Sequence, residues 1–324
     1  MSSILDQTVQ IASESTYGTF VSPTRAYEAQ VDTFARDVTY IQSVGMRRDL
    51  QTIRSDRDDT VTLGATGSIE TDVLNKGHGL LMKEMLGTSA IAQQAATVAY
   101  LQTFTSDDTG PTGSYSTQVS RVDSGGTLRC FTYNGCVPTG WNITAALDAA
   151  VKMTIDFDAE EEVSTESEAT PAYPASTDFY TFDQVTVEIG NTAINTFTNF
   201  SLDAALQMDT SRRFLKGSSV KSQPKRNSVP MYTGTVEGEF ADLTQYAAFA
   251  AGTVFKLEMI ATGSTIVGAY PYKFHVTMPA VKWTGSTPVA SLDDMTRISL
   301  PFQVLYDGTN PAVTIEYQST DTAF

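Results

Sequence analysis

The sequence predicts a mainly β fold, and three observations carry this prediction. Apolar and polar residues alternate over several short segments, as they do in strands with one buried face. Aromatic residues that suit pleated surfaces are frequent, with 14 tyrosines and 16 phenylalanines among 324 residues. Only two segments have the composition and spacing of a helix. A chain of this length can also bury a large core without disulfides or metals.

Five segments show the strand pattern most clearly. Each alternates apolar residues with polar ones, so that one face is buried and the other is solvated. The segments are 151–158, 185–189, 200–208, 274–278 and 298–304. Pro301 lacks an amide hydrogen, so we expect its strand to lie at a sheet edge or Pro301 to face outward.

Two short helices are predicted. The first is confined to residues 80–86, because Gly77 and Gly79 lower the helix propensity of the residues before it. The second covers residues 242–251, whose apolar side chains share one face, and Gly252 can end it.

The two halves of the chain resemble each other. The Arg-Arg pair at 47–48 recurs at 212–213, and Thr-Gly-Ser-Ile-Glu at 66–70 recurs as Thr-Gly-Thr-Val-Glu at 233–237. These matches occur in the same order and on the same expected elements, which favours a duplication. A segment rich in Ser, Thr, Pro and acidic residues separates the halves and is expected to be a linker or long surface loop. The predicted division is a first domain at 1–163, a linker at 164–178 and a second domain at 179–324.

Side chains able to carry chemistry are scarce. The only histidines are His78, expected in a turn, and His275, expected on the solvated side of a strand. A zinc site needs more ligands at close spacing. Cys130 and Cys136 could bridge across a hairpin or stay reduced, and both possibilities remain open. The composition therefore points to a structural or binding protein.

The net charge of −16 disfavours conventional nucleic-acid binding. The basic residues are nonetheless concentrated in two polar segments, 45–63 and 211–230. Those in the first are Arg47, Arg48, Arg54 and Arg57, and those in the second are Arg212, Arg213, Lys216, Lys221, Lys225 and Arg226. Acidic residues gather at Asp156, Asp158, Glu160, Glu161 and Glu162. Either these are solvated loops, or the basic loops contact the acidic surface of another copy and set the register of assembly. We expect both loops to be mobile in a free subunit.

The beginning of the chain resembles a known family. Residues 14–19, Glu-Ser-Thr-Tyr-Gly-Thr, followed by Pro-Thr at 23–24, are similar to the start of major tail tube proteins of long-tailed (siphovirus-like) bacteriophages. The later order also fits, with a long loop, Gly-Ser-Ile-Glu at 67–70, a helix, and Gly-Cys-Val at 135–137 before an alternating strand. The resemblance implies two tandem tail-tube-like β-barrel or sandwich domains, each with one short flanking helix.

The resemblance also implies a function. The protein would be a structural virion component, not an enzyme, that self-assembles into stacked rings as the conduit for DNA delivery. Its partners would be copies of itself, a tape measure protein, and tail terminator and tip proteins. DNA would pass through without specific binding, which an acidic protein favours. No cofactor, metal or membrane is expected. The location would be the virion tail and, before assembly, the host cytoplasm.

Two further interpretations stay open, as does the stoichiometry. The protein could be another virion β protein, such as a head or connector component, or a carbohydrate-binding or adhesin-like module. Trp141 and Trp283 would then form an exposed platform; their corresponding positions in the two halves favour core packing instead. If each chain supplies two of six domains around a channel, three chains close a ring with pseudo-sixfold symmetry. A ring of six chains is the alternative.

Overall fold

The computed structural model describes residues 6–49, 52–107, 109–285, 287–288 and 296–324. It is mainly β, as predicted, with two short α-helices. The elements are β1 (Thr8–Ser13), β2 (Arg25–Tyr27), β3 (Ala29–Asp32), β4 (Ala35–Gln42), β5 (Asp58–Asp72), α1 (Gly79–Met82), β6 (Gly87–Gln93), β7 (Tyr100–Ser106), β8 (Tyr115–Val122), β9 (Leu128–Ala146), β10 (Lys152–Ala159), β11 (Glu161–Val163), β12 (Val185–Ile189), β13 (Thr192–Ala193), β14 (Phe197–Ala205), β15 (Met208–Asp209), β16 (Lys225–Arg226), β17 (Met231–Glu239), α2 (Thr244–Ala251), β18 (Val254–Val267), β19 (Tyr270–Trp283), β20 (Arg297–Val304) and β21 (Thr314–Ser319), with single 3-10 turns at Ser55–Arg57 and Phe182–Gln184.

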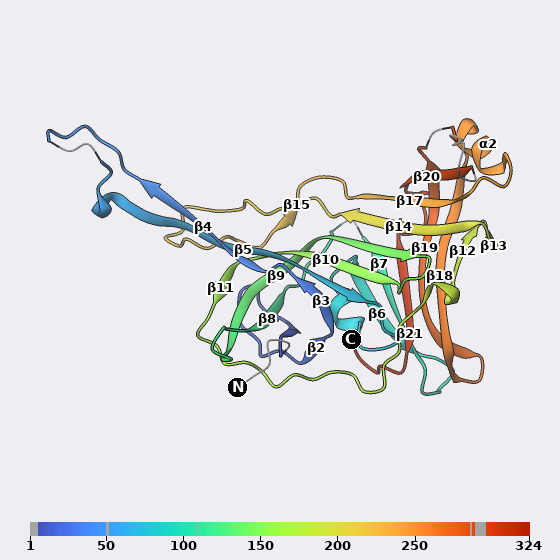
Figure 1. Cartoon of the computed structure of the whole chain (residues 1–324), viewed down its shortest axis with the longest axis horizontal. Coiled ribbons are helices and arrows are strands. Elements are labelled where there is room, and N and C mark those ends of the chain that lie inside the picture. Colours follow the sequence, from blue (N-terminus) through green and yellow to red (C-terminus); the bar gives the residue numbers. More distant parts are fainter. Residues whose placement is uncertain (1–5, 50–51, 108, 286, 289–295) are drawn as a thin grey trace.

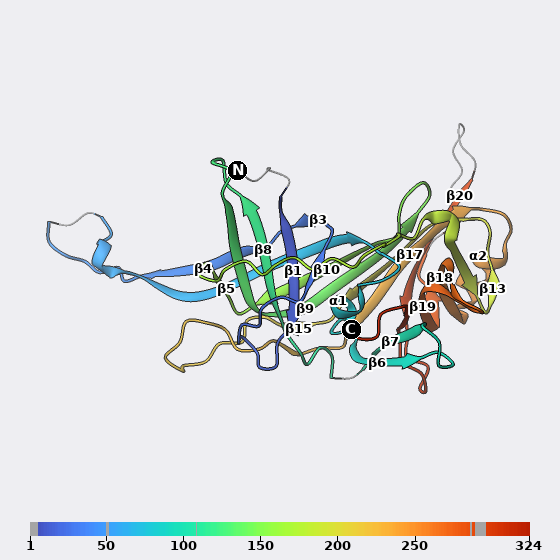
Figure 2. The ribbon, with the colours of Figure 1, turned by 90° about the horizontal axis from the view of Figure 1, so that it is seen from below.

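One continuous antiparallel sheet runs through both halves of the chain. Its central strands follow the order β4, β5, β10, β9, β14, β17, β20, β19. The first four belong to the first half of the sequence and the last four to the second half. Flanking strands extend each half: β8 and β1 continue from β9, whereas β18 and β12 continue from β19. Figures 1 and 2 show the long strands of both halves lying side by side.

The sequence repeat coincides with a repeat in strand register. In the first half Ile69 lies opposite Ile155, and in the second half Val236 lies opposite Leu300. The two pairs occupy matching positions of the repeated segments, so residues at equivalent positions face each other in both halves. The observed strands contain all five predicted segments or most of each. The division into domains at 1–163 and 179–324 with a linker at 164–178 stays a prediction. Strands of the two halves pair with each other, β9 with β14 and β7 with β21, so the sheet itself marks no boundary between them.

The core lies on one face of this sheet and continues between the halves. Trp141 and Trp283 are both buried, as core packing predicts. Each indole nitrogen also donates a hydrogen bond toward the helix of its own half, to the carbonyl of Met85 at 3.2 Å and to Oε1 of Gln245 at 3.2 Å. The tryptophans therefore attach the helices to the sheet, and neither can serve as an exposed platform.

The first helix is shorter than predicted, and Tyr115 explains why. The expected helix at 80–86 ends at Met82. The Tyr115 hydroxyl donates to the carbonyl of Leu80 at 2.7 Å and accepts from the amide of Glu84 at 3.0 Å. In a continuing α-helix these two backbone groups would bond each other. The second helix ends at Gly252, whose φ of 63° is left-handed, as predicted.

The segment 164–178 is a long surface loop that crosses β1 and β8 as a strap (Figure 2). Gln118, fully buried, donates to the carbonyl of Ser167 at 3.1 Å and accepts from the amide of Ala169 at 3.0 Å. Gln10 donates to the carbonyl of Ala169 at 3.0 Å. These amide side chains, together with the backbone amide of Ala26 in β2, which donates to the carbonyl of Ala172 at 3.0 Å, hold the strap in place.

The motif that carries the family resemblance has a structural role. The Glu14 carboxylate accepts hydrogen bonds from the amides of Gly18 and Gly135, both at 2.9 Å, and from the hydroxyls of Ser114 at 2.6 Å and Ser116 at 2.8 Å. Gly18 is required because its φ is 73° and a β-carbon there would collide with Glu160. One carboxylate thus joins the end of β1 to β8 and β9.

The structure decides between the two alternatives left open for the cysteines and corrects the extent of one loop. The cysteines are free: Cys130 and Cys136 lie six residues apart on the single strand β9, roughly 20 Å in extended chain, so they cannot bridge across a hairpin. Burial raises the pKa of the Cys136 thiol to about 12, which makes it unreactive. The long loop expected at 45–63 is also shorter, because β5 begins at Asp58, opposite Gln42 of β4.

Candidate inter-subunit surfaces

The paired strands β4 and β5 project from the body of the molecule as an arm (Figures 1 and 2). We call residues 38–62 the first arm. It carries all four basic residues expected in the first loop: Arg47, Arg48, Arg54 and Arg57. Arg54 pairs with Asp56, and Arg48 lies 3.7 Å from Asp49 with both side chains almost fully exposed. These exposed pairs contribute little to stability, so the arm presents its charge to solvent.

The second arm, residues 207–230, behaves differently because it lies against its own chain. Arg213 donates to the backbone carbonyls of Leu63 at 3.0 Å and Ser219 at 2.9 Å. Arg226 donates to the carbonyl of Asp107 at 2.7 Å, and Arg212 donates to that of Gln223 at 2.5 Å. Lys216 donates to the Ser222 hydroxyl at 3.2 Å as well. With Lys221, described next, five of the six predicted contact residues therefore hold the arm itself. Contact of Lys216 and Lys225 with another copy stays a prediction.

A buried ion pair anchors the second arm. Lys221 pairs with Asp158 of β10, and their side chains are only 5% and 2% exposed. Burial raises the pKa of Asp158, and the Lys221 ammonium opposes this shift. These two residues, which we expected on opposite sides of a contact between copies, meet within one chain.

The rest of the predicted acidic surface lies at the same end of the molecule as the arms. Asp156 is exposed on β10, and Glu161 and Glu162 are half-buried on β11. Glu160 is half-buried as well, and burial together with the nearby Glu161 charge raises its pKa to about 6. Their contact with another copy stays a prediction.

One face of the central sheet is polar across both halves, which sequence reasoning did not assign to any role. A row of side chains crosses six strands through direct cross-strand neighbours: Glu70, Thr154, Asn142, Asp203, Thr233 and Gln303. An adjacent row consists of Asp72, Lys152, Thr144, Ser201, Thr235 and Pro301. We call these two rows the polar face.

Hydrogen bonds organise the polar face and neutralise its single lysine. Lys152 Nζ lies 2.9 Å from Oε1 of Glu70 and 2.7 Å from Oε1 of Gln30. Asn142 donates to Oδ1 of Asp203 at 2.6 Å. The remaining charges in the two rows are carboxylates, so the face is acidic and offers no unpaired cation to a phosphate backbone. In the sequence, the alternating polar residues of 151–158 and 200–208 indicated that each strand has one polar side. The order in which the strands pair, which brings these sides together into one face, could not be read from the sequence.

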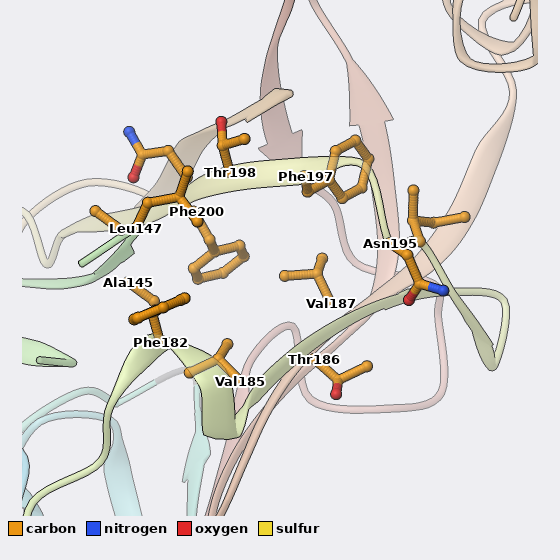
Figure 3. A pocket seen from close by; sticks show the side chains of 13 residues that line it. Ala145, Leu147, Phe182, Val185, Thr186, Val187, Asn195, Phe197, Thr198 and Phe200 are labelled. Carbon is orange, nitrogen blue, oxygen red and sulfur yellow. The ribbon is translucent and has the colours of Figure 1, made fainter. Parts of the chain in front are cut away.

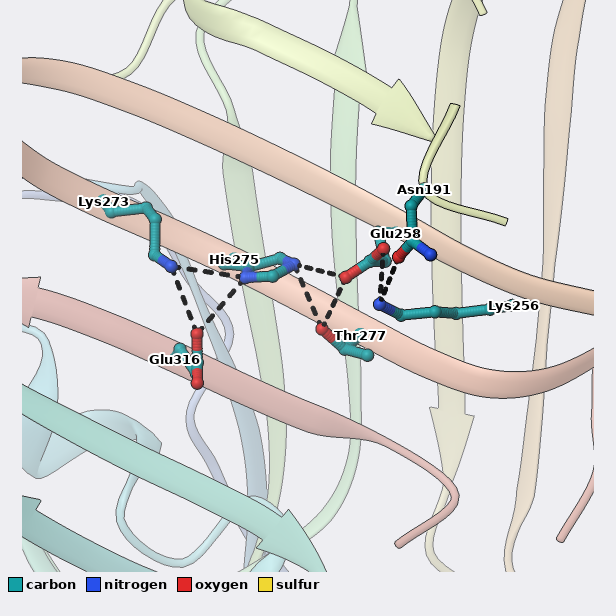
Figure 4. A network of polar contacts seen from close by, with 7 residues as sticks. All are labelled: Asn191, Lys256, Glu258, Lys273, His275, Thr277 and Glu316. Carbon is teal, nitrogen blue, oxygen red and sulfur yellow. Dashed lines mark hydrogen bonds and ion pairs between the residues drawn. The ribbon is translucent and has the colours of Figure 1, made fainter. Parts of the chain in front are cut away.

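His275 does not lie in solvent as expected. It belongs to a polar cluster on the outer face of β18, β19 and β21 (Figure 4). Its side chain is 14% exposed; Nε2 lies 3.0 Å from Oε1 of Glu258, and Nδ1 lies 3.2 Å from Oε2 of Glu316. Lys273 and Lys256 add ion pairs to Glu316 at 3.2 Å and to Glu258 at 2.8 Å. The cluster therefore joins three strands.

The described part of the chain was also expected to hold no metal site and no membrane segment. Within the described ranges, no group of three or more His, Cys, Asp or Glu is placed to hold a metal ion. No helix there is long and apolar enough to cross a membrane.

His78 is buried at the start of α1, where burial lowers its pKa to about 4, and it stacks edge-on against Tyr27.

Comparison with known proteins identifies a family. The model of a family described as phage tail tube protein matches residues 5–304, which include the strap, both arms and the second half as far as the end of β20. No curated protein shows a significant match to the chain.

The buried ion pair predicts a large effect of a single substitution. Lys221→Met leaves the Asp158 carboxylate buried without its partner, and we expect a loss of about 3–5 kcal/mol in the free energy of unfolding, measured with urea. Lys216→Met, on the exposed part of the same arm, should change it by less than about 0.5 kcal/mol. Combining Lys221→Met with Asp158→Leu should recover most of the loss. Wild-type stability of Lys221→Met alone would contradict this role of the pair.

The His275 cluster predicts acid sensitivity. The hydrogen bond from His275 and the charge of Lys273 lower the pKa of Glu316 from 4.5 to about 2. A carboxyl whose pKa is lowered on folding stabilises the fold above its ordinary pKa, and the contribution disappears as the pH falls from 4.5 toward 2. Glu316→Gln should therefore lower the Tm by a few degrees at pH 7 and match the wild type near pH 2. Glu28→Gln, at an exposed site, is the control; equal pH profiles for Glu316→Gln and wild type would refute the prediction.

Proposed function

The chain belongs to the family of phage tail tube proteins, and from this premise we propose that its copies close into stacked rings around a channel that conducts DNA. Membership makes it a structural protein of the virion tail that associates with itself. The channel, the rings and their stoichiometry are the proposal. The observation that supports them best is the continuous sheet with one polar, acidic face.

The polar face suits a channel wall. DNA carries a phosphate charge at every step, and neutralising contacts would create affinity that slows passage. A wall of Thr, Ser and Asn with carboxylates at Glu70 and Asp203 gives no such contact, since Lys152 is paired. The opposite face of the same strands is buried in the core. We therefore place the polar face toward the axis.

The junction between β9 and β14 offers a template for the junction between chains. It pairs Trp141 with Ala204 and Ile143 with Leu202, joining the last strand of one repeat to the first strand of the next. Among the described residues, the outer edge of β4, the counterpart of β14, pairs with no strand. At the other end of the sheet β20 meets β19 only through Phe302, Gln303 and Val304.

Pairing the outer edge of β4 in one copy with the unpaired part of the β20 edge in another would remove both open edges and, like the β9–β14 junction, would join one repeat to the next. Each chain then supplies two units, residues 1–163 and 179–324, and three chains close a ring with pseudo-sixfold symmetry. Six chains per ring remain the alternative. Tape measure, terminator and tip proteins would contact the channel and the ends of the tube.

The alternative of a carbohydrate-binding or adhesin-like module loses its candidate platform, because both tryptophans are buried. A head or connector component has no specific support beyond the β fold.

The first arm provides the test of assembly. Arg47→Glu with Arg48→Glu reverses two exposed charges that hold nothing in the fold, so the subunit should keep its Tm while tube formation, seen by negative-stain electron microscopy, is blocked. Arg129→Glu is the control, because the Arg129 side chain is 62% exposed on the β8–β9 hairpin, where it pairs with Asp123. Normal tubes from the double variant would count against a role of the first arm in polymerisation.

A further inference from the structure

An amine and a carboxyl group meet in the interior of the molecule at Lys221 and Asp158, where the second arm joins β10. The apolar gap between β12 and β14, by contrast, offers no reactive group. Its volume is about 220 Å³, and none of the residues that line it is titratable (Figure 3). The buried pair therefore has the groups and the environment for a reaction within the chain.

Burial sets this pair apart from the three other lysine–carboxylate pairs described above. The side chains of Lys221 and Asp158 are 5% and 2% exposed. In the pairs with Glu70, Glu258 and Glu316, the lysine side chain is 39%, 36% and 28% exposed. Water stabilises the charges of those three pairs but does not reach this one. The neutral amine and carboxylic acid are therefore least disfavoured at Lys221 and Asp158.

The two charged groups are poorly satisfied in their buried site. Among the described residues, Oδ1 of Asp158 is the one acceptor for Lys221 Nζ, although an ammonium has three hydrogens to donate. Oδ2 of Asp158 is buried and has no hydrogen-bond partner in the described part of the chain. An amide made from these groups keeps one N–H and one C=O. Condensation would therefore remove the buried polar atoms that lack partners.

Gly64 and Asp37 lie next to the pair. Gly64 of β5 leaves room for the lysine, because a β-carbon there would lie 2.9 Å from Cε and 3.1 Å from Nζ of Lys221. Asp37 of β4 is the cross-strand neighbour of Gly64. Burial raises the pKa of Asp158 and the Lys221 charge opposes this shift, whereas the Asp37 charge adds to it. A second carboxylate is thus near enough to accept and return a proton.

We propose that Lys221 and Asp158 condense into an amide, an isopeptide bond that ties the second arm covalently to β10. Within the pair, the ammonium first gives one proton to the carboxylate, which yields the amine and the carboxylic acid. Nζ then attacks Cγ of Asp158, and a bond forms between these two atoms. The bond from Cγ to one oxygen breaks, and this oxygen leaves as water with a second proton from Nζ, relayed by Asp37. The reaction releases one water and needs no oxidant, reductant or added group.

The bond would give the second arm a permanent anchor. It would close a loop between two residues that are 63 positions apart in the sequence. The ion pair is the state before the reaction, and Lys221→Met removes both states. The part of the stability that Lys221→Met with Asp158→Leu does not recover would then be the contribution of the bond. The reaction lies within one chain and is independent of how copies assemble.

Intact mass tests the bond directly. Purified wild-type protein is denatured, reduced and measured by electrospray mass spectrometry, and we expect the main species to be lighter by one water than its sequence mass. After digestion with trypsin, the peptide that contains Asp158 should be joined to the peptide that contains Lys221. Lys221→Arg is the matched control, because a guanidinium keeps the charge but stays protonated, and this variant should lose no water.

The rate of the reaction tests the relay by Asp37. Protein made in a cell-free system is sampled over time, and the loss of water is followed by mass. Asp37→Asn should react about a hundredfold more slowly than the wild type while it folds normally by circular dichroism. Asp59→Asn, at an exposed position of the same β4–β5 hairpin, should react like the wild type.

A wild-type chain with its full sequence mass would overturn the bond. A loss of water without the joined peptides, or one that persists in Lys221→Arg, would overturn it as well. Equal rates for Asp37→Asn and the wild type would overturn the relay by Asp37.

Discussion

The pairing of β9 with β14 is the interaction on which the rest of the structure depends. It joins the two halves edge to edge, so that eight central strands form one sheet. One face of this sheet is polar across both halves, and the other is buried in the core. Because successive side chains of a strand point to opposite faces, a shift of one residue at this junction would turn every polar side chain of the second half into the core. The register Ile143 to Leu202 avoids this conflict and aligns Asn142 with Asp203.

That constraint explains how the two halves can differ elsewhere. The repeated strands are fixed by their pairing, whereas the loops and arms are free to diverge. In the first half the strap covers the outer face and Glu14 gathers the ends of β1, β8 and β9. In the second half the outer face carries the His275 cluster, and the arm is anchored through Lys221. Because only the second arm is anchored by a buried ion pair, the two halves would make different contacts in the ring of three chains proposed above.

The sequence predicted the repeated elements well, because alternation reports which face of a strand is buried. The match of 66–70 with 233–237 coincides with equivalent strand pairs, Ile69 opposite Ile155 and Val236 opposite Leu300. The buried tryptophans and the end of α2 at Gly252 followed from equally local signals. The polar sides of the strands were visible too, but their union into one face depends on the order of strands, which no local pattern contains.

Long-range contacts account for what the sequence did not predict. Tyr115 ends α1 from more than thirty residues away, and Gln118 orders a segment that reads as a linker. Lys221 and Asp158 were each recognised as contact residues, yet charge clustering could not show that they meet in the same chain. For His275, the alternation correctly placed the residue on the polar side of its strand, but carboxylates from two neighbouring strands enclose it, so it is not solvated as expected.

The central claim is that one chain contributes two equivalent units to each ring. The mass of a single ring, from scanning transmission electron microscopy of assembled tubes, tests it most directly. Three chains of 35.0 kDa make a ring of 105 kDa, which is the result that the β9–β14 template predicts. Six chains would make a ring of 210 kDa; that mass would contradict the template and assign the second half to a different position in the tube.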